Sequence, residues 1–144
     1  MLLRADAKVD LLRDLPLFEL CSKRDLRRIA ALAEERLVDE GAGLIREGEP
    51  GREFFVVVDG EVDVRRRGRR VARLGAGSYV GEIALLSRSP RTATVTARTS
   101  LRVLAISGTD FVGLLDALPE LWLKVARTLA DRVEADEAMD AARP

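Results

Sequence analysis

The chain has 144 residues, the size of one ordinary domain, and 47% of them are hydrophobic, so it can bury a core of its own. Lys and Arg number 24, and Asp and Glu also number 24, so the overall charge indicates neither nucleic acid nor an acidic surface as a partner. Histidine, the commonest general base and metal ligand, is absent, so we expect neither an enzyme nor a metal site.

Three further features concern the compartment. Cys21 is the single cysteine and cannot form an internal disulfide, which fits a cytoplasmic protein. The longest apolar runs are far shorter than the roughly 18 residues that cross a bilayer, so no membrane span is predicted. The N-terminal segment 1–14 interrupts its leucines with charges every few residues, so it is not a secretory signal.

The first predicted element is a helix. Ser22 and Asp25 resemble a capping box in which Asp replaces Glu. Apolar residues at spacings of three and four then share one helix face: Leu26, Ile29, Ala30, Ala33 and Leu37. Gly41 and Gly43 end this pattern, so the helical part of the domain is predicted to span residues 15–40.

Strands and turns are predicted over residues 41–106. Phe54–Val58 is rich in β-forming residues, Asp59-Gly60 is typical of a two-residue hairpin turn, and Glu61–Arg65 alternates strictly. The remaining predicted strands are Arg69–Leu74, which returns after a turn at Gly68, and Thr92–Arg98 and Leu101–Ile106, which are expected to pair with each other. Short strands separated by glycine turns predict an antiparallel β-roll, or jelly roll.

Five arginines surround Gly68 in the run Arg65–Arg70. A basic run of this kind could contact nucleic acid or anionic lipid. We favour the simpler interpretation, a hairpin tip whose charges are solvated.

Helices are predicted again over residues 107–137. The apolar positions of this segment are Phe111, Leu114, Leu115 and Leu118, and then, after Pro119 at a helix start, the stripe Leu121, Val125, Leu129 and Val133. Trp122 lies one position off the stripe and is expected in the core or at a dimer interface. Residues 138–144 carry no pattern and are predicted to fray, so the domain is expected to span residues 15–137.

The segment 81–97, GEIALLSRSPRTATVTA, places an acid and an arginine around an apolar run. A helical turn that begins after Gly81 would direct free N–H groups at one point, and Arg91 could clamp the same anion. A carboxylate at Glu82 suits a hydroxyl beside that anion, such as a ribose 2′-OH. The residues alone also allow a structural ion pair between Glu82 and Arg91.

These residues resemble a known family. Gly81-Glu82-Ile83-Ala84-Leu85 with Pro90-Arg91-Thr92-Ala93 is similar to the phosphate-binding cassette of the cyclic nucleotide-binding domain, found in the catabolite activator protein, in regulatory subunits of cAMP-dependent kinase and in nucleotide-gated channels. Residues 45–51 and 54–62 resemble the first, glycine-marked strands of that family. The resemblance covers about residues 15–135.

The resemblance implies a cyclic nucleotide ligand and a role for each matching residue. The residue matching Arg91 holds the phosphate and the one matching Glu82 takes the ribose 2′-OH. The backbone completes the cradle at Gly81, Ile83, Ala84 and Ala93. Thr92 occupies a position that reaches a phosphate oxygen or a guanine amino group, and we expect cAMP over cGMP. Val71 and Val80 are expected to form apolar walls for the base.

The expected function is that of a regulatory or sensor domain that transmits ligand binding through its C-terminal helix. No recognition helix follows that helix, so we expect no DNA binding by this chain alone. The partner would be a second copy of the chain, bound through the C-terminal helix, or an unidentified effector protein or fused module. The competing hypothesis is a family fold that has lost its ligand and serves as a structural or dimerisation scaffold.

Overall fold

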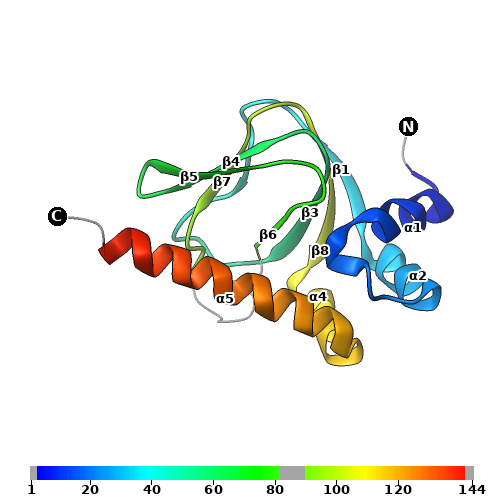
Figure 1. The fold of residues 1–144 in the computed structure, drawn as a ribbon. Helices are drawn as coiled ribbons and strands as arrows, with labels where there is room; N and C mark the ends of the chain where they lie inside the picture. Colours follow the sequence, from blue (N-terminus) through cyan, green and yellow to red (C-terminus); the bar gives the residue numbers. More distant parts are fainter. Residues whose placement is uncertain (1–2, 82–89, 142–144) are drawn as a thin grey trace.

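The computed structural model of the protein describes residues 3–81 and 90–141, and in it two β-sheets form a roll that is flanked by helices (Figure 1). The helices are α1 (Ala5–Asp14), a 3₁₀ turn (Pro16–Phe18), α2 (Lys23–Leu32), α4 (Gly108–Ala117) and α5 (Pro119–Ala141). The strands are β1 (Glu34–Val38), β2 (Gly43–Ile45), β3 (Glu53–Asp59), β4 (Val62–Arg66), β5 (Arg69–Leu74), β6 (Tyr79–Val80), β7 (Thr94–Ala97) and β8 (Leu101–Ser107).

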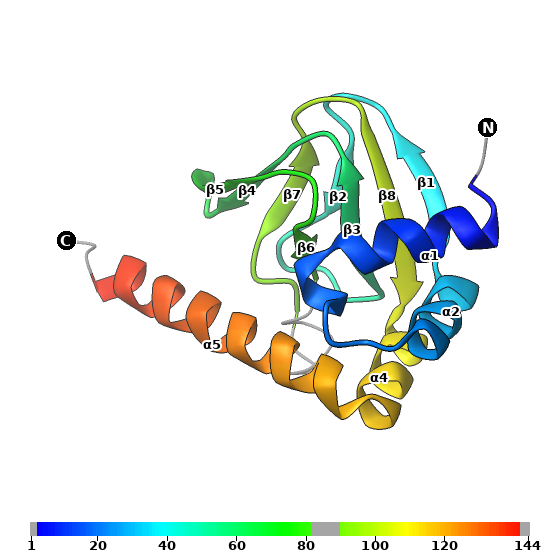
Figure 2. The ribbon, with the colours of Figure 1, turned by 45° about the vertical axis from the view of Figure 1, so that its right-hand side comes forward.

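The strands form two antiparallel four-stranded sheets, so the predicted β-roll is confirmed. The first sheet has the order β1-β8-β3-β6 and the second has the order β2-β7-β4-β5. One apolar cluster lies between the sheets and a second lies between the first sheet and the helices, which cover its outer side (Figure 2). β3 is apolar at consecutive positions because it is buried on both faces: Phe54 and Val56 belong to the helix-side cluster, and Phe55 and Val57 to the inner one.

The helical N-terminal part begins earlier and ends earlier than the predicted span 15–40, since α1 starts at Ala5 and α2 ends at Leu32. The capping box of Ser22 and Asp25 is present at the start of α2. The predicted helical span 15–40 is wrong beyond Leu32, because Glu34–Val38 pairs with β8 as a strand and leaves Leu37 68% exposed. The tertiary ladder therefore overrides the local helical period. Residues of the predicted N-terminal segment 1–14 form α1, which buries Val9 and Leu12 against the helix-side core.

The two predicted strand pairs flanking Asp59-Gly60 and Thr99-Ser100 are wrong. At both places the chain passes from one sheet to the other, since β3 and β8 belong to the first sheet and β4 and β7 to the second. The crossings pack together: Gly60 has φ +94°, and a Cβ built there would lie 2.4 Å from the Ser100 carbonyl oxygen. The glycine thus serves a close approach of two chain segments rather than a hairpin.

The arginine-rich run forms the predicted hairpin. β4 and β5 pair, and Arg67 and Gly68 both have positive φ at the turn. Arg65, Arg69 and Arg70 are exposed there, as expected for a solvated tip.

The predicted stripe of α5 is buried at its first positions and half-buried at Leu129, and the side chain of Val133 lies outside the description. Leu121 and Val125 are buried in the helix-side core. Trp122 is 44% exposed, which excludes the core for this residue, and its place at a dimer interface stays a prediction. α5 continues to Ala141, so the described part of the segment 138–144 is helical, and its fraying stays a prediction. Residues 134–141 contain neither glycine nor proline, so the backbone continues as helix without an apolar stripe.

Candidate functional site

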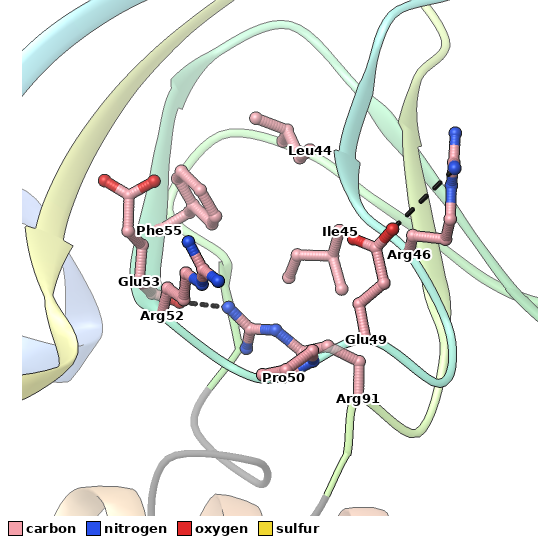
Figure 3. A pocket seen from close by; sticks show the side chains of 9 residues that line it. All are labelled: Leu44, Ile45, Arg46, Glu49, Pro50, Arg52, Glu53, Phe55 and Arg91. Carbon is pink, nitrogen blue, oxygen red and sulfur yellow. Dashed lines mark hydrogen bonds and ion pairs between the residues drawn. The ribbon is translucent and has the colours of Figure 1, made fainter.

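Arg91 is a buried arginine between the two sheets. The residue is 7% exposed, and its Nη1 donates to the Gly81 carbonyl oxygen at 2.8 Å. Its Nη2 donates to the Glu53 carbonyl oxygen at 2.5 Å (Figure 3). Because the two nitrogens belong to one planar group, these bonds fix the plane of the guanidinium as well as its position.

The backbone of Arg91 is held from the other side by the turn that precedes β3. The Arg91 N–H donates to the Glu49 carbonyl oxygen at 2.7 Å, and the Gly48 N–H donates to the Arg91 carbonyl oxygen at 2.9 Å. Pro50 and Pro90 form an isolated β-bridge beside these bonds. The residue is therefore anchored at both its backbone and its side chain.

Gly81 lies directly against the Arg91 side chain at the end of β6. Its φ is +103°, a region that side chains other than glycine rarely adopt. A Cβ at this position would lie 2.8 Å from Arg91 Nη1 and 2.8 Å from the Glu53 carbonyl oxygen. Only glycine leaves room for the arginine to reach both carbonyls.

A cavity of about 520 Å³ adjoins Arg91 on the side of β2 and β3 (Figure 3). Leu44, Ile45 and Phe55 supply its apolar wall, and its other lining residues are Arg46, Glu49, Pro50, Arg52 and Glu53. Arg46 and Glu49 form an exposed ion pair at its rim, with 3.7 Å between Nη1 and Oε1. The Arg91 guanidinium therefore borders a cavity that has an apolar wall and a charged rim.

The structure brings two of the predicted site residues together, Gly81 and Arg91. Val80 is buried in the inner core, and Thr92 and Ala93 are half-buried between Arg91 and β7. Val71 lies on β5 in the second sheet and is exposed. The predicted residues Glu82, Ile83 and Ala84 lie outside the described residues, and so does the alternative ion pair between Glu82 and Arg91.

The sequence reasoning missed Glu53 and the turn at residues 48–50. Both act on Arg91 through backbone carbonyl and amide groups, which every residue type supplies. No residue pattern in the sequence predicts which backbone groups contact Arg91. The contacts follow from the arrangement of β3 beside β6.

Three other features of the described residues concern metal binding, the cysteine and the membrane. Within residues 3–81 and 90–141, no group of three acidic or cysteine side chains could hold a metal ion. Burial, with smaller effects of Asp25 and Glu120, raises the pKa of Cys21 to about 11, so its thiol stays protonated near neutral pH. None of the described helices is long and apolar enough to cross a bilayer.

Comparison with known proteins shows the family of this chain. Residues 35–117, more than half of the chain, match the family described as the cyclic nucleotide-binding domain. The chain belongs to this family, which confirms the resemblance seen in the sequence. The family is defined by ligand binding rather than by a reaction.

Individual relatives cover most of this chain but only part of their own length. A cAMP-dependent protein kinase regulatory subunit of Eremothecium gossypii is 37% identical over 124 residues, which are 85% of this chain and 27% of that protein. A cyclic nucleotide-gated potassium channel of Rhizobium etli is 37% identical over 117 residues, 81% of this chain and 33% of that one. The chain therefore spans about a quarter to a third of these relatives.

Solved structures support the fold. The cAMP-bound PfPKA-R (141–441) superposes with a TM-score of 0.87 and 23% identity, covering 94% of this chain and 47% of that one. At that identity the likeness concerns the fold.

Gly81 provides a test of this geometry. We expect Gly81→Ala to lower the free energy of unfolding by about 2–4 kcal/mol, because the added methyl group meets a fixed carbonyl and strains the backbone. The matched control is Gly77→Ala, where φ is +90° but the nearest atoms to a Cβ are 3.8 Å away. The control should lose only about 1–2 kcal/mol. Urea unfolding measures both, and equal losses would contradict the close packing at Gly81.

Proposed function

We propose that this domain binds one cyclic nucleotide, and cAMP in preference to cGMP. The observation that carries the proposal is the buried guanidinium of Arg91, fixed against Gly81, the first residue of the segment that resembles a phosphate-binding cassette. A planar, permanently charged group held in one orientation suits a phosphate with two accessible oxygens. Membership of the cyclic nucleotide-binding family supplies the ligand class.

Each proposed site residue has a role that its chemistry allows. Arg91 would hold the cyclic phosphate, and Glu82 would accept the ribose 2′-OH, since a carboxylate would repel the phosphate. Backbone groups of Gly81, Ile83, Ala84 and Ala93 would complete the cradle. Thr92 would donate to a phosphate oxygen, and Val71 and Val80 would contact the base.

The preference for cAMP has support from the relatives. The kinase regulatory subunit of E. gossypii is named for cAMP, and the superposed PfPKA-R is a cAMP-bound form. Thr92 alone suits either nucleotide, because its hydroxyl can serve a phosphate oxygen or a guanine amino group.

We also propose that α5 transmits ligand binding to a partner or a fused module. The start of α5 is anchored in the helix-side core by Leu121 and Val125, while Trp122 and Leu123 on the same turns are exposed. The exposed pair would contact an effector protein or a second copy of the chain. A ligand can shift α5 only by its differential affinity for two arrangements, and couplings of this kind are typically about 1–3 kcal/mol.

Titration calorimetry with cAMP and cGMP tests the binding proposal. We expect the wild type to bind one cAMP per chain and Arg91→Ala to weaken binding by about 2–4 kcal/mol, roughly 30-fold to 1,000-fold, because a charge-assisted bidentate contact is lost. Arg98→Ala, at an exposed arginine after β7, is the control and should bind like the wild type. Absence of heat from every variant would favour the scaffold hypothesis.

Amide hydrogen exchange tests the proposed role of α5. With saturating cAMP we expect slower exchange across residues 119–137 as well as across residues 81–93, because the ligand would favour one docking of the helix. Protection confined to residues 81–93 would show that α5 does not respond and that the output leaves by another route.

A further inference from the structure

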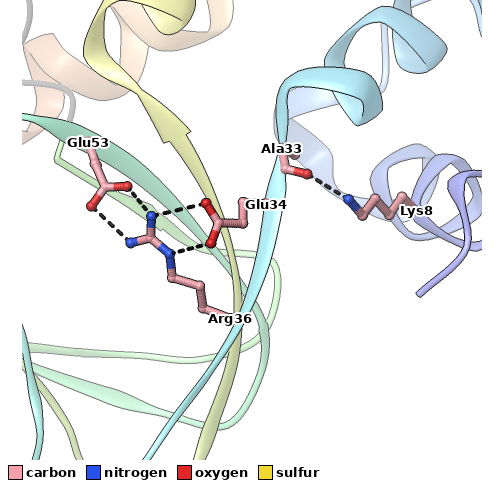
Figure 4. A network of polar contacts seen from close by, with 5 residues as sticks. All are labelled: Lys8, Ala33, Glu34, Arg36 and Glu53. Carbon is pink, nitrogen blue, oxygen red and sulfur yellow. Dashed lines mark hydrogen bonds and ion pairs between the residues drawn. The ribbon is translucent and has the colours of Figure 1, made fainter. Parts of the chain in front are cut away.

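Arg36 forms a bidentate ion pair that spans a strand of the first sheet. Its Nη1 donates to Glu53 Oε1 at 2.9 Å and its Nη2 donates to Glu53 Oε2 at 2.6 Å (Figure 4). Glu34 accepts from the same guanidinium at 3.3 Å through each of its two oxygens. Two parallel N–H···O bonds fix the relative orientation of the two side chains, which a single bond does not.

The pair joins the two strands on either side of β8. Arg36 on β1 lies opposite Val103 of β8, and Glu53, the first residue of β3, lies opposite Ser107. Directly paired residues share a face of the sheet. Val103 and Phe55 belong to the inner cluster, so the pair lies on the face that looks toward the second sheet.

Glu53 uses its side chain and its backbone for two different arginines. The carboxylate is held by Arg36, and the carbonyl oxygen of the same residue accepts from Arg91 Nη2 at 2.5 Å. The two hydrogen bonds from Arg36 restrict the conformation of the Glu53 side chain at the start of β3. Glu53 thereby connects the Arg36 guanidinium to the Arg91 guanidinium.

We propose that Arg36 and Glu53 form a positioning pair that orients Arg91 for the phosphate of the ligand. The inference rests on the proposed function, since it assigns these residues an effect on ligand affinity. Arg36 acts through Glu53 and Arg91 and touches no ligand in this account. Together the three residues form a chain from β1 to the binding site.

The exposure of the pair indicates that orientation, rather than stability, is its main effect. The side chains of Arg36 and Glu53 are 37% and 30% exposed, and ion pairs at such positions stabilise a fold little. The hydrogen bonds that Arg36 donates to Glu53 first, and then to Glu34, raise the pKa of Arg36 above its ordinary value. The Arg36 guanidinium therefore keeps its charge.

A double-mutant cycle with cAMP separates this role from a structural one. Arg36→Gln removes the charge and the bidentate hydrogen bonds to Glu53. Arg36→Lys keeps the charge but cannot form the bidentate pair. We expect either variant to weaken cAMP binding roughly threefold to tenfold in the wild-type background, and less than about twofold in an Arg91→Lys background. A residue that acts only through Arg91 has no effect once the Arg91 guanidinium is gone.

The control is Arg98→Gln, which breaks another partly exposed ion pair, Arg98 with Glu61 at 3.7 Å, in the turn after β7. It should leave cAMP affinity unchanged. Thermal unfolding of each variant shows that it is folded at the titration temperature, and if Arg36→Gln is not, Arg36→Lys carries the test.

Each outcome has a defined meaning. Loss of affinity in the wild-type background alone supports the positioning pair. Equal losses in both backgrounds, or no loss in either while Arg91→Lys itself binds weakly, would overturn it and leave the proposed function standing. A wild-type protein that binds no cyclic nucleotide would overturn both.

Discussion

The hydrogen bonds of one buried arginine join the parts of this structure that matter for its site. Arg91 contacts the end of β6 through Gly81, the start of β3 through Glu53, and the turn before β3 through Glu49. Each contact uses a backbone group, so the chain path at three separate places has to agree for the guanidinium to be held. The glycine at position 81 is a consequence of the same constraint, since a Cβ there would occupy the space that Arg91 needs.

β3 connects this site to the helices because its alternate residues face opposite ways. Phe55 lines the cavity beside Arg91, while its neighbour Phe54 stacks on Phe111 of α4 with ring centroids 4.2 Å apart. The backbone adds a second link, since the Gly108 N–H at the start of α4 donates to the Arg52 carbonyl oxygen at 2.8 Å. A change in the position of β3 at the site would therefore reach α4 directly, and α5 through it, which supports the proposed route of transmission.

The sequence predicted which elements this fold contains better than it predicted which strands pair with each other. The β-roll, the capping box at Ser22 and the hairpin at Gly68 follow from local patterns of spacing and turn residues, and all three are present. The partners of β3 and β7 do not follow from local patterns, because Asp59-Gly60 suits a hairpin turn as well as a crossing between sheets. The same limit applies to Leu37. Its spacing fits a helix, but its strand pairs with β8, which lies far away in the sequence.

For the site, the sequence motif predicted which residues lie next to each other, and two of them can be compared with the structure. Gly81 and Arg91 were predicted together and lie together. Glu53 was not predicted, because its contact with Arg91 uses a carbonyl that any residue would offer. Arg36 was missed for a related reason: its pairing with Glu53 depends on two strands that flank β8, and no motif in the sequence joins them.

The most direct test of the account is a crystal structure of the domain with cAMP. The account predicts that the cyclic phosphate lies within hydrogen-bond distance, about 3 Å, of the Arg91 guanidinium and next to the Gly81 backbone. It also predicts that Nη2 keeps its bond to the Glu53 carbonyl oxygen in the complex. A nucleotide whose phosphate lies away from Arg91, or is held by other cations, would contradict the claim that this arginine is the centre of the site.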